Sequence, residues 1–279
     1  MRELSGKAAF VTGGASGIGL ALGRAFAQAG MKVMLADIES EALAAALESL
    51  REFGPEVRGV ICDVADPASV GHAATTSYRK FGNIHVVCNN AGVAGGGGID
   101  HISLDSWRWV LDVNLMGVLH GIRSFLPHFR AHGEGGHFVN TASMAGMNAG
   151  GLGFSAYVAS KFAVVGMSEG LAQQLAPLGI GVTVICPDYV RTHIAASGRN
   201  RPERYGPTPT FDAASPAGML LARITQNIEA GLDSSAVAAR VLNAIRQDKL
   251  YVFTHPEVRG ELEARFDAIM TALNEAAAG

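Results

Sequence analysis

The amino-acid sequence predicts an α/β fold with a doubly wound, parallel sheet of seven strands and helices on both faces. Short apolar segments alternate with helix-length segments, and most of the apolar segments are continuous rather than alternating. Continuous apolar strands are typical of parallel sheets that are buried on both faces. Repeated strand–helix–strand units connect such strands by right-handed crossovers, which place helices on both sides of the sheet.

Seven segments have the length and composition of strands: residues 8–12, 32–37, 57–62, 85–89, 137–141, 181–186 and 250–253. The segments between them have helical length and spacing: residues 17–29, 40–53, 67–81, 103–131, 155–178 and 234–247. No linker or repeat divides the chain, so we expect one dinucleotide-binding domain over residues 1–279.

Two segments depart from this alternation. Residues 193–230 contain four of the ten prolines and no strand pattern. Long irregular connections in compact domains are usually lids or binding loops, so we expect a substrate loop there. Residues 256–276 are expected to add a C-terminal helix, because apolar residues recur in them at intervals of three or four.

The composition excludes several classes of protein. Hydrophobic residues make up 48% of the 279 residues, charged residues make up 17%, and the net charge is −3. A disordered chain would combine low hydrophobicity with high charge, and a general nucleic-acid binder would be basic. Residues 135–160 carry no Asp, Glu, Lys or Arg, but their many polar residues and glycines do not fit a membrane span.

The N-terminal segment and the cysteines indicate the compartment. No apolar signal core follows Met1. Cys62, Cys88 and Cys186 are odd in number and far apart, which fits neither a disulfide framework nor a zinc site. We therefore expect a reduced, cytoplasmic protein without a bound metal.

A glycine-rich turn, Thr12-Gly13-Gly14-Ala15-Ser16-Gly17-Ile18-Gly19, follows the first predicted strand. A turn from strand to helix gathers backbone N–H groups at the positive end of the helix, which suits a pyrophosphate. Glycines permit unusual φ values and let phosphates approach the backbone. Taken alone, the turn could also be a connection without a ligand. Within this alternation of elements, it favours a Rossmann-like fold.

Asp37 ends the second predicted strand, 20 residues after Gly17. Dinucleotide-binding folds place an acidic residue there, and its carboxylate binds the adenosine ribose hydroxyls. A carboxylate repels a 2′-phosphate, and the adjoining sequence offers no Lys or Arg to bind one. Asp37 could instead cap the helix that starts near Ser40. Together with the glycine turn, it favours NAD over NADP as the cofactor.

Tyr157 and Lys161 are four residues apart, which places both on one face of the predicted helix. A neighbouring positive charge favours a tyrosinate, so the pair suits general acid/base chemistry. The alternatives are a half-buried aromatic and a surface lysine. Only ten of the 110 residues from 81 to 190 are charged, and Lys161 is the sole Asp, Glu, Lys or Arg between Glu134 and Glu169. This shortage of charge favours a buried reaction centre.

Taken together, these motifs resemble the short-chain dehydrogenase/reductase family over most of the chain. The glycine turn matches its cofactor motif, Cys62-Asp63-Val64 resembles its adenine-contacting segment, and Asn89-Asn90-Ala91-Gly92 resembles the motif after its fourth strand. Its catalytic residues correspond to Asn114, Ser143, Tyr157 and Lys161. The resemblance implies cofactor contacts at Gly13, Ser16, Gly17, Ile18, Gly19, Asp37, Asp63, Val64, Asn90, Ala91, Gly92, Tyr157, Lys161, Pro187, Val190 and Thr192.

The resemblance also implies a mechanism that needs no metal. Tyr157 exchanges a proton with the substrate hydroxyl, and Ser143 binds the same oxygen. Lys161 lowers the pKa of Tyr157 and binds the nicotinamide ribose, while Asn114 holds a water that links Lys161 to solvent. Hydride passes between the substrate carbon and the nicotinamide, so the protein is expected to be an NAD-dependent oxidoreductase acting on CH–OH groups.

One position departs from the family pattern. The family usually has Pro-Gly after the sixth strand, whereas this sequence has Pro187-Asp188. Asp tolerates the left-handed conformation, so Asp188 could be an ordinary turn residue. We expect it to lie near the nicotinamide instead.

The lining of the substrate pocket is predicted to be apolar and adaptable, which fits a bulky aromatic or alicyclic secondary alcohol. Residues 199–206 and 254–259 are similar to segments of aryl-ether Cα-dehydrogenases, which oxidise benzylic alcohols with NAD. The arginines in 199–206 could alternatively bind an anionic substrate or be solvated. The expected lining consists of Met144, Met147, Leu152, Phe154, Tyr189, Phe211, Met219 and Leu220, beside the glycine run 95–98.

Two other functions are alternatives to an NAD-dependent dehydrogenase. An NADPH-dependent ketoreductase of the 3-oxoacyl type is disfavoured by Asp37. A non-catalytic nucleotide-binding scaffold is disfavoured by the intact Ser143, Tyr157 and Lys161. For the dehydrogenase and for the ketoreductase alike, the small-molecule substrate would be a secondary alcohol or ketone.

The helices predicted at 103–131 and 155–178 also indicate self-association. The second of them carries only two charged residues. A helix that is apolar nearly all round is usually buried on two sides. We therefore expect a homodimer or homotetramer through these two helices, with burial under the C-terminal helix as the alternative.

Overall fold

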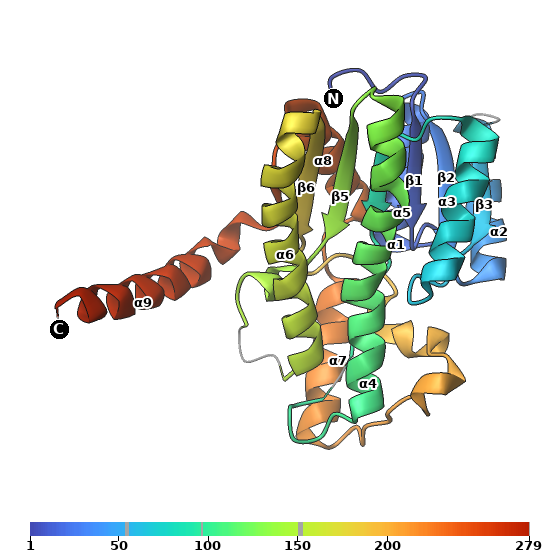
Figure 1. The fold of residues 1–279 in the computed structure, drawn as a ribbon. Helices are drawn as coiled ribbons and strands as arrows, with labels where there is room; N and C mark the ends of the chain where they lie inside the picture. The colour runs from blue at the N-terminus through green and yellow to red at the C-terminus, as the bar shows by residue number, and fades with distance from the viewer. Residues whose placement is uncertain (54–55, 96, 150–152, 279) are drawn as a thin grey trace.

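The structure is a computed structural model that describes residues 1–53, 56–95, 97–149 and 153–278. In these residues seven strands form one sheet in the order β3-β2-β1-β4-β5-β6-β7 (Figure 1). Every neighbouring pair is parallel. The predicted α/β, Rossmann-like fold is therefore confirmed. The strands are β1 Ala8–Thr12, β2 Lys32–Asp37, β3 Val57–Ile61, β4 Val86–Asn89, β5 Gly136–Thr141, β6 Ile180–Cys186 and β7 Tyr251–Phe253.

Alternating residues of each strand face two separate apolar clusters. Phe10 of β1 joins the cluster under helices α3 to α6, and Val11 joins the cluster under α1, α2 and α8. Burial on both faces explains why the strand sequences are continuously apolar. The helices of the two layers are α1 Gly17–Gln28, α2 Ser40–Ser49, α3 Pro67–Phe81, α4 Leu104–Leu111, α5 Gly117–His132, α6 Ser155–Leu175 and α8 Ser234–Gln247.

The strand order reverses between β1 and β4, because β1 leads to β2 on one side and pairs with β4 on the other. In open parallel sheets, such a switch point leaves a crevice at the carboxyl ends of the strands, where ligands bind. The helix predicted at 103–131 is interrupted between Leu111 and Gly117. Between α4 and α5, residues Asp112–Met116 form a π-helical turn.

The segment predicted as an irregular substrate loop, 193–230, is largely helical. It contains 3₁₀ turns at Ile194–Asn200 and Glu203–Tyr205, followed by helix α7 Pro216–Glu229. The side chain of Ser215 accepts a hydrogen bond from the backbone N–H of Gly218 at 3.1 Å, and Pro216 occupies the first helical turn. Both features are helix-start signals that the sequence contains, so Pro216 begins a helix there rather than interrupting one.

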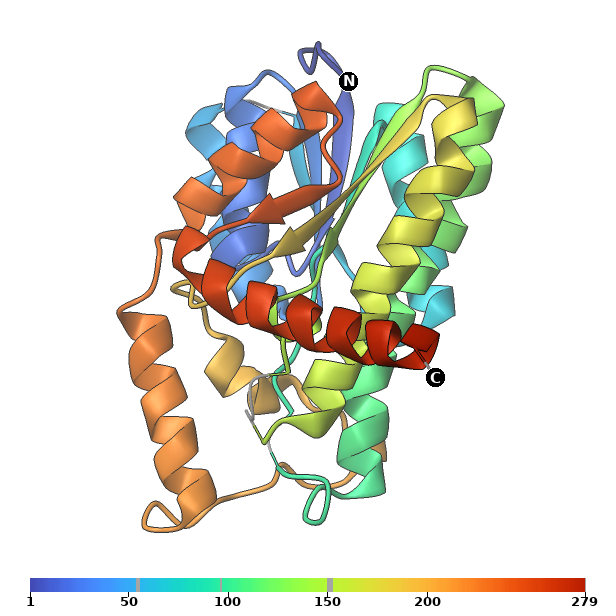
Figure 2. The same ribbon diagram turned by 90° about the vertical axis from the view of Figure 1, so that its left-hand side faces the viewer.

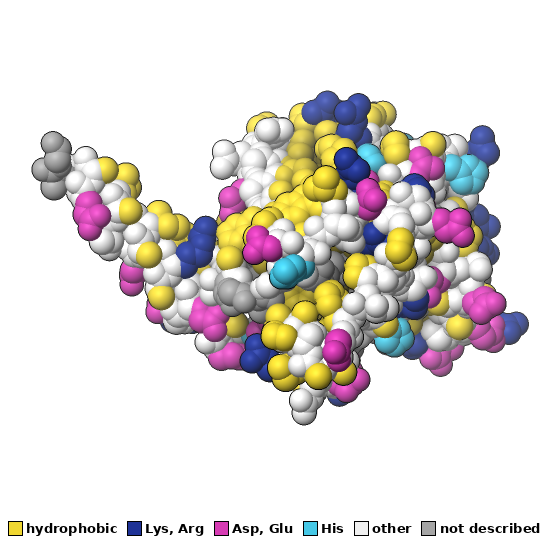
Figure 3. All heavy atoms as spheres, turned by 90° about the horizontal axis from the view of Figure 1, so that it is seen from below, with side chains coloured by type: hydrophobic (Ala, Val, Ile, Leu, Met, Phe, Trp, Pro, Cys, Tyr) yellow, Lys and Arg dark blue, Asp and Glu magenta, His cyan; other side chains and the backbone are white. Residues whose placement is uncertain are grey.

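Helix α9, Arg259–Ala278, projects from the body of the molecule (Figures 1 and 2). Its first turns pack against the core through Leu262, while Phe266, Ile269, Met270 and Leu273 are each about half exposed. Hydrophobic side chains are visible along this arm at the left of Figure 3. Among the described helices, none is long and apolar enough to cross a membrane.

Candidate active site

A cavity of about 460 Å³ opens at the carboxyl ends of the strands. It is lined by residues that follow β1, β2, β3, β4, β5 and β6. Of the site residues named from the sequence, Gly19 and Asn114 lie behind the wall, and the others line it. The lining residues among them are Gly13, Ser16, Gly17, Ile18, Asp37, Asp63, Val64, Asn90, Ala91, Gly92, Ser143, Tyr157, Lys161, Pro187, Val190 and Thr192.

The glycine turn is packed too closely for side chains at two positions. A Cβ at Gly19 would lie 2.0 Å from the carbonyl oxygen of Gly13. Gly13 has a φ of +62°, and a Cβ there would lie 2.9 Å from Cα of Ala91. Helix α1 starts at Gly17, and its N-cap residue Ser16 makes no side-chain capping bond. The N-terminal N–H groups of α1 are therefore available to a bound anion at this end of the cavity.

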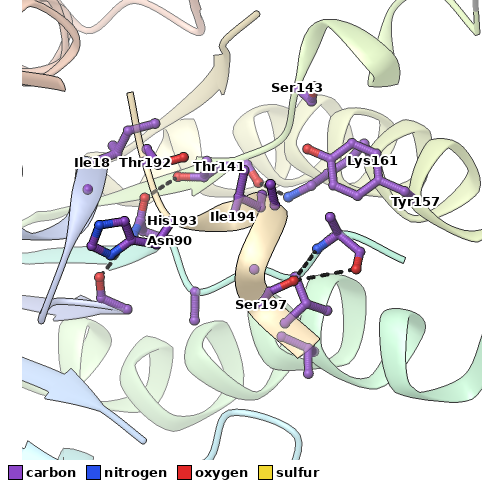
Figure 4. A pocket seen from close by; sticks show the side chains of 18 of the residues that line it. Ile18, Asn90, Thr141, Ser143, Tyr157, Lys161, Thr192, His193, Ile194 and Ser197 are labelled. Atoms are coloured by element: carbon purple, nitrogen blue, oxygen red, sulfur yellow. Dashed lines mark hydrogen bonds between the residues drawn. The ribbon is translucent and has the colours of Figure 1, made fainter. Parts of the chain in front are cut away.

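Asn90 connects three strand ends in the floor of the cavity. Its side-chain Nδ2 donates to the carbonyl oxygen of Thr12 at 3.0 Å, and its Oδ1 accepts from Thr141 Oγ1 at 3.2 Å. The backbone carbonyl of Thr141 in turn accepts from Lys161 Nζ at 2.9 Å (Figure 4). This chain of bonds fixes the glycine turn relative to Lys161.

The carboxylate of Asp37 is held at the end of β2. It accepts hydrogen bonds from the backbone N–H groups of Ala15 at 2.9 Å and Glu39 at 3.1 Å. The side chain lines the cavity although Asp37 is largely buried. The bonds leave the carboxylate fixed beside the glycine turn, where it suits a ribose diol and opposes a phosphate.

Tyr157, Ser143 and Lys161 meet at the other end of the cavity (Figure 4). Lys161 is 2% exposed, and its ammonium lies 5.5 Å from the centre of the Tyr157 ring. Burial lowers the pKa of Lys161 to about 8. The alternative of a surface lysine is therefore wrong, because Lys161 is buried, whereas Tyr157 beside it is half-buried in the cavity wall.

The pKa of Tyr157 differs from the expectation. Burial raises it, the neighbouring Ser143 hydroxyl lowers it by hydrogen bonding, and the negative charge of Asp188 raises it. The net direction is upward, whereas the resemblance implied that Lys161 lowers it. The physical reason is desolvation, which penalises the charged tyrosinate in the wall of the cavity just as it penalises the buried ammonium.

Asn114 lies on the π-helical turn and is completely buried. Its Oδ1 accepts from the backbone N–H of Val93 at 2.8 Å, and its Nδ2 donates to the Val93 carbonyl at 3.0 Å and to Ser160 Oγ at 3.2 Å. A Cβ placed at Gly92 would lie 3.4 Å from Asn114 Oδ1 and 3.6 Å from Lys161 Nζ. Asn114 thus holds the segment after β4, and its side chain and that of Lys161 both lie close to Gly92.

The segment after β6 closes the cavity above Tyr157. The carbonyl of Pro187 accepts from Ser143 Oγ at 3.3 Å. The backbone N–H of Asp188 donates to Thr254 Oγ1 at 3.2 Å, and the half-buried carboxylate is close enough to raise the pKa of Tyr157. Burial also raises the pKa of Asp188 itself. Asp188 therefore lies at the Tyr157 end of the cavity.

The predicted substrate lining is correct only in part. Met144, Phe154 and Tyr189 line the cavity, but Met147, Phe211, Met219 and Leu220 do not, and Leu152 and Gly96 fall outside the described residues. The segment 193–230 does reach the site as predicted, but through other residues of α7, namely Leu221, Ile224 and Ile228. Val258 and Glu261, at the 3₁₀ turn before α9 and in its first turn, were not predicted to line the cavity.

Arginines of the 194–205 segment also reach the cavity. Arg199 forms an ion pair with Glu39 at 2.6 Å, and Arg204 forms one with Asp63 at 2.8 Å. A basic residue therefore does lie beside the end of β2, contrary to the expectation from the adjoining sequence. Arg199 is 160 residues away from Glu39 in the chain, so no local pattern could reveal the contact.

Comparison with known proteins identifies the family. Residues 7–203, well over half of the chain, match the family described as short chain dehydrogenase. The protein is a short-chain dehydrogenase. Members of this family are oxidoreductases, so the protein is an enzyme that acts on CH–OH groups with a nicotinamide cofactor.

The short-chain dehydrogenase has similar relatives along nearly its whole length. It is 34% identical to a C alpha-dehydrogenase from Sphingobium sp., over 98% of this chain and 88% of that protein. It is 35% identical to a 1-deoxy-11-beta-hydroxypentalenate dehydrogenase from Streptomyces avermitilis, over 96% and 91% of the two chains. A short-chain dehydrogenase/reductase from Burkholderia phymatum, solved in complex with NAD, superposes with a TM-score of 0.92 at 36% identity, covering 98% and 97%. The similarity to aryl-ether Cα-dehydrogenases is thereby confirmed.

Proposed function

We propose that this enzyme is an NAD-dependent dehydrogenase for bulky, aromatic or alicyclic secondary alcohols, with Tyr157 as its general acid/base. The observation that carries the proposal is the arrangement of Tyr157 and Ser143 in the cavity wall with Lys161 buried beside them. Two hydroxyls can contact one substrate oxygen there, and the nearby ammonium is shielded from water. In water the same charge would be strongly screened.

The residues perform the following steps in the direction of alcohol oxidation. Ser143 Oγ turns its hydrogen from the Pro187 carbonyl to the substrate oxygen and holds that oxygen at the Tyr157 hydroxyl. Tyr157, as the phenolate, accepts the hydroxyl proton while the substrate carbon loses a hydride. NAD, when bound, supplies the hydride acceptor at the nicotinamide C4. Lys161, protonated below its pKa of about 8, provides a positive charge that favours the phenolate.

Asn114 and the cofactor contacts position this machinery. Asn114 fixes the backbone of Val93 behind Lys161, and a water bound at its amide would link the ammonium to solvent. The glycine turn with the start of α1 would hold the pyrophosphate, and Asp37 would hold the adenosine ribose. Asp63, Val64 and the 90–92 segment would contact the adenine side, and Pro187, Val190 and Thr192 the nicotinamide side.

The preference for NAD rests on Asp37. Its carboxylate is fixed by two backbone N–H groups, so it cannot turn away from an incoming 2′-phosphate. The alternative is an NADPH-dependent ketoreductase, which the position of Arg199 favours. A polyketide ketoreductase solved with NADPH shares the fold at a TM-score of 0.75 and 30% identity.

The substrate class rests on the apolar wall. Leu221, Ile224 and Ile228 of α7 line the cavity together with Met144 and Phe154. Apolar walls of this kind bind the body of a ligand, while a few polar groups orient it. The names of the relatives, a C alpha-dehydrogenase and a hydroxypentalenate dehydrogenase, agree with a bulky secondary alcohol.

The proposal is tested by incubating the enzyme with NAD⁺ or NADP⁺ and a panel of secondary alcohols, including benzylic alcohols and hydroxysteroids, while following absorbance at 340 nm. We expect turnover with NAD⁺ and a bulky alcohol, and loss of turnover in Tyr157→Phe with NAD binding retained. Full activity of Tyr157→Phe would contradict the assigned role. Binding of nucleotide without turnover of any substrate would favour the scaffold.

We also propose that residues 1–279 act as one domain with 256–276 as an extension, and that the enzyme is a homodimer or homotetramer through α4–α5 and α6. Arg265, in the first turns of α9, lies over the ring of Phe162 on α6, while the rest of the arm points away from the body. Light scattering after gel filtration measures the assembly, and a monomer would overturn it. The three free, buried cysteines support a cytoplasmic enzyme.

A further inference from the structure

Arg199 makes a two-point contact with Glu39 inside the cavity. Arg199 Nη2 donates to Glu39 Oε1 at 2.6 Å, and Arg199 Nε donates to Glu39 Oε2 at 3.1 Å. Asn200 Nδ2 donates to the same Oε1 at 2.7 Å. The three side chains line the cavity together with Asp37, which lies two residues before Glu39.

The guanidinium is held in place from its other side as well. Arg199 Nη1 donates to the backbone carbonyls of Ala196 at 2.9 Å and His193 at 3.3 Å. All three nitrogens of the group are therefore engaged, and one of them is fixed within its own 3₁₀ turn. If Glu39 lost its charge, Arg199 would remain anchored at this position with two donor directions released.

A planar guanidinium binds a phosphate in the same two-point geometry in which it binds a carboxylate. The Glu39 carboxylate thus occupies the donors that a phosphate near the ribose would use. The ion pair also lowers the pKa of Glu39, mainly through the hydrogen bond from Arg199, so Glu39 stays charged at neutral pH. The cavity therefore holds a cation close to Asp37, but one that is already neutralised.

We propose that Glu39 determines cofactor selectivity by occupying Arg199, which would otherwise bind the 2′-phosphate of NADP. This inference rests on the proposed use of NAD through Asp37 and adds a second, independent element to it. Asp37 opposes the 2′-phosphate by repulsion, whereas Glu39 withholds the attraction that could overcome this repulsion. The second ion pair of the segment, Arg204 with Asp63, keeps residues 194–205 against the cavity when the first is broken.

The inference is tested by calorimetric binding of two fragments of the cofactors, adenosine 5′-monophosphate and adenosine 2′,5′-bisphosphate, to the full chain. In Glu39→Gln we expect affinity for the bisphosphate to rise about fivefold, with less than a twofold change for the monophosphate. The pair is partly exposed, which limits the size of the effect. In Arg199→Gln we expect the affinity for the bisphosphate to fall, because an unpaired Glu39 carboxylate adds to the repulsion of the 2′-phosphate.

The double variant Glu39→Gln/Arg199→Gln separates attraction from simple loss of charge. In the double variant we expect the ratio of the affinities for the bisphosphate and the monophosphate to return to about the wild-type value. Glu41→Gln, which removes the same charge from an exposed position of α2, should leave this ratio of affinities unchanged. An equal rise in the double variant, or no rise in Glu39→Gln, would overturn the role of Arg199. A wild-type enzyme that binds the bisphosphate more tightly than the monophosphate would instead overturn the proposed NAD preference itself.

Discussion

Replacing Lys161 with Met should stabilise the protein in a way that depends on pH. Burial lowers the pKa of Lys161 from 10.5 to about 8, so the folded protein holds its ammonium at a cost. That shift corresponds to about 3 kcal/mol at pH values where both states are protonated. Methionine has a similar shape and no charge, so the variant does not carry this cost.

The sign follows from proton counting. Below pH 8 the lysine is protonated in both the folded and the unfolded state, and the cost is fully present. Between pH 8 and pH 10.5 the unfolded state binds more protons, so wild-type stability rises with pH. Above pH 10.5 the lysine is neutral in both states and the cost is gone.

One opposing contribution is independent of pH. The carbonyl of Thr141 loses the hydrogen bond from Lys161 Nζ, and leaving a buried acceptor unpaired costs about 1–3 kcal/mol. At pH 7 the variant is therefore expected to be more stable than wild type by roughly 0–2 kcal/mol. The advantage should shrink by about 3 kcal/mol as the pH rises from 8 to 10.5.

Urea denaturation of both proteins at several pH values and one fixed protein concentration measures the difference. Lys249→Met, at an exposed position, serves as the matched control and should show no such trend. If the free energies of unfolding of wild type and Lys161→Met change in parallel from pH 7 to pH 10.5, Lys161 does not carry a buried charge, and its proposed effect on Tyr157 fails with it.

Three further expectations concern the cavity. Gly19→Ala should weaken nucleotide binding more than about tenfold and lower the Tm by several degrees, because its Cβ would lie 2.0 Å from the Gly13 carbonyl oxygen. Calorimetry measures the loss of binding and thermal denaturation measures the change in Tm. Gly71→Ala, at a position with open space around it, is the control and should change neither. Asp188→Asn should lower the pKa of Tyr157, because the Asp188 carboxylate raises that pKa. The rising limb of the kcat–pH profile for alcohol oxidation should therefore move to lower pH, and an unmoved profile would argue against an effect of Asp188 on Tyr157. Asp188→Gly should change the affinity for NAD⁺, and an unchanged affinity would argue against a position of Asp188 near the nicotinamide. Ile224→Ala should raise KM for a bulky alcohol about fivefold with kcat little changed, because Ile224 lines the cavity. Met219→Ala, at an exposed position outside the cavity, should change neither constant. Equal effects of the two variants would rule out α7 as the substrate wall.

The parts of the fold and site that could be predicted are those encoded locally. The continuous apolar strands and the spacing of Tyr157 and Lys161 are read from adjacent residues, and the structure has the same elements within a few residues. The start of α7 was encoded too, by Ser215 and Pro216, but the four prolines of the segment obscured it. The positions that could not be predicted depend on tertiary contacts between distant segments.

Two properties of the site show that limit in physical terms. The pairing of Arg199 with Glu39 joins residues far apart in the chain, so the sequence near Asp37 contained no sign of a cation. The pKa of Tyr157 depends on how deeply the ring is buried, and the spacing of Tyr157 and Lys161 gives only their proximity. Proximity predicted a lowered pKa, whereas burial raises it.

The π-helical turn that carries Asn114 restricts how the length of the chain can vary. Such a turn contains one residue more than the α-helical turn it replaces. Removing one residue from Asp112–Met116 would restore a regular helix and leave the orientation of α4 relative to α5 nearly unchanged, but it would remove the widened turn that directs Asn114 toward Val93. Single-residue deletions should therefore be tolerated in exposed surface connections and eliminated in this helix wherever dehydrogenase activity is selected.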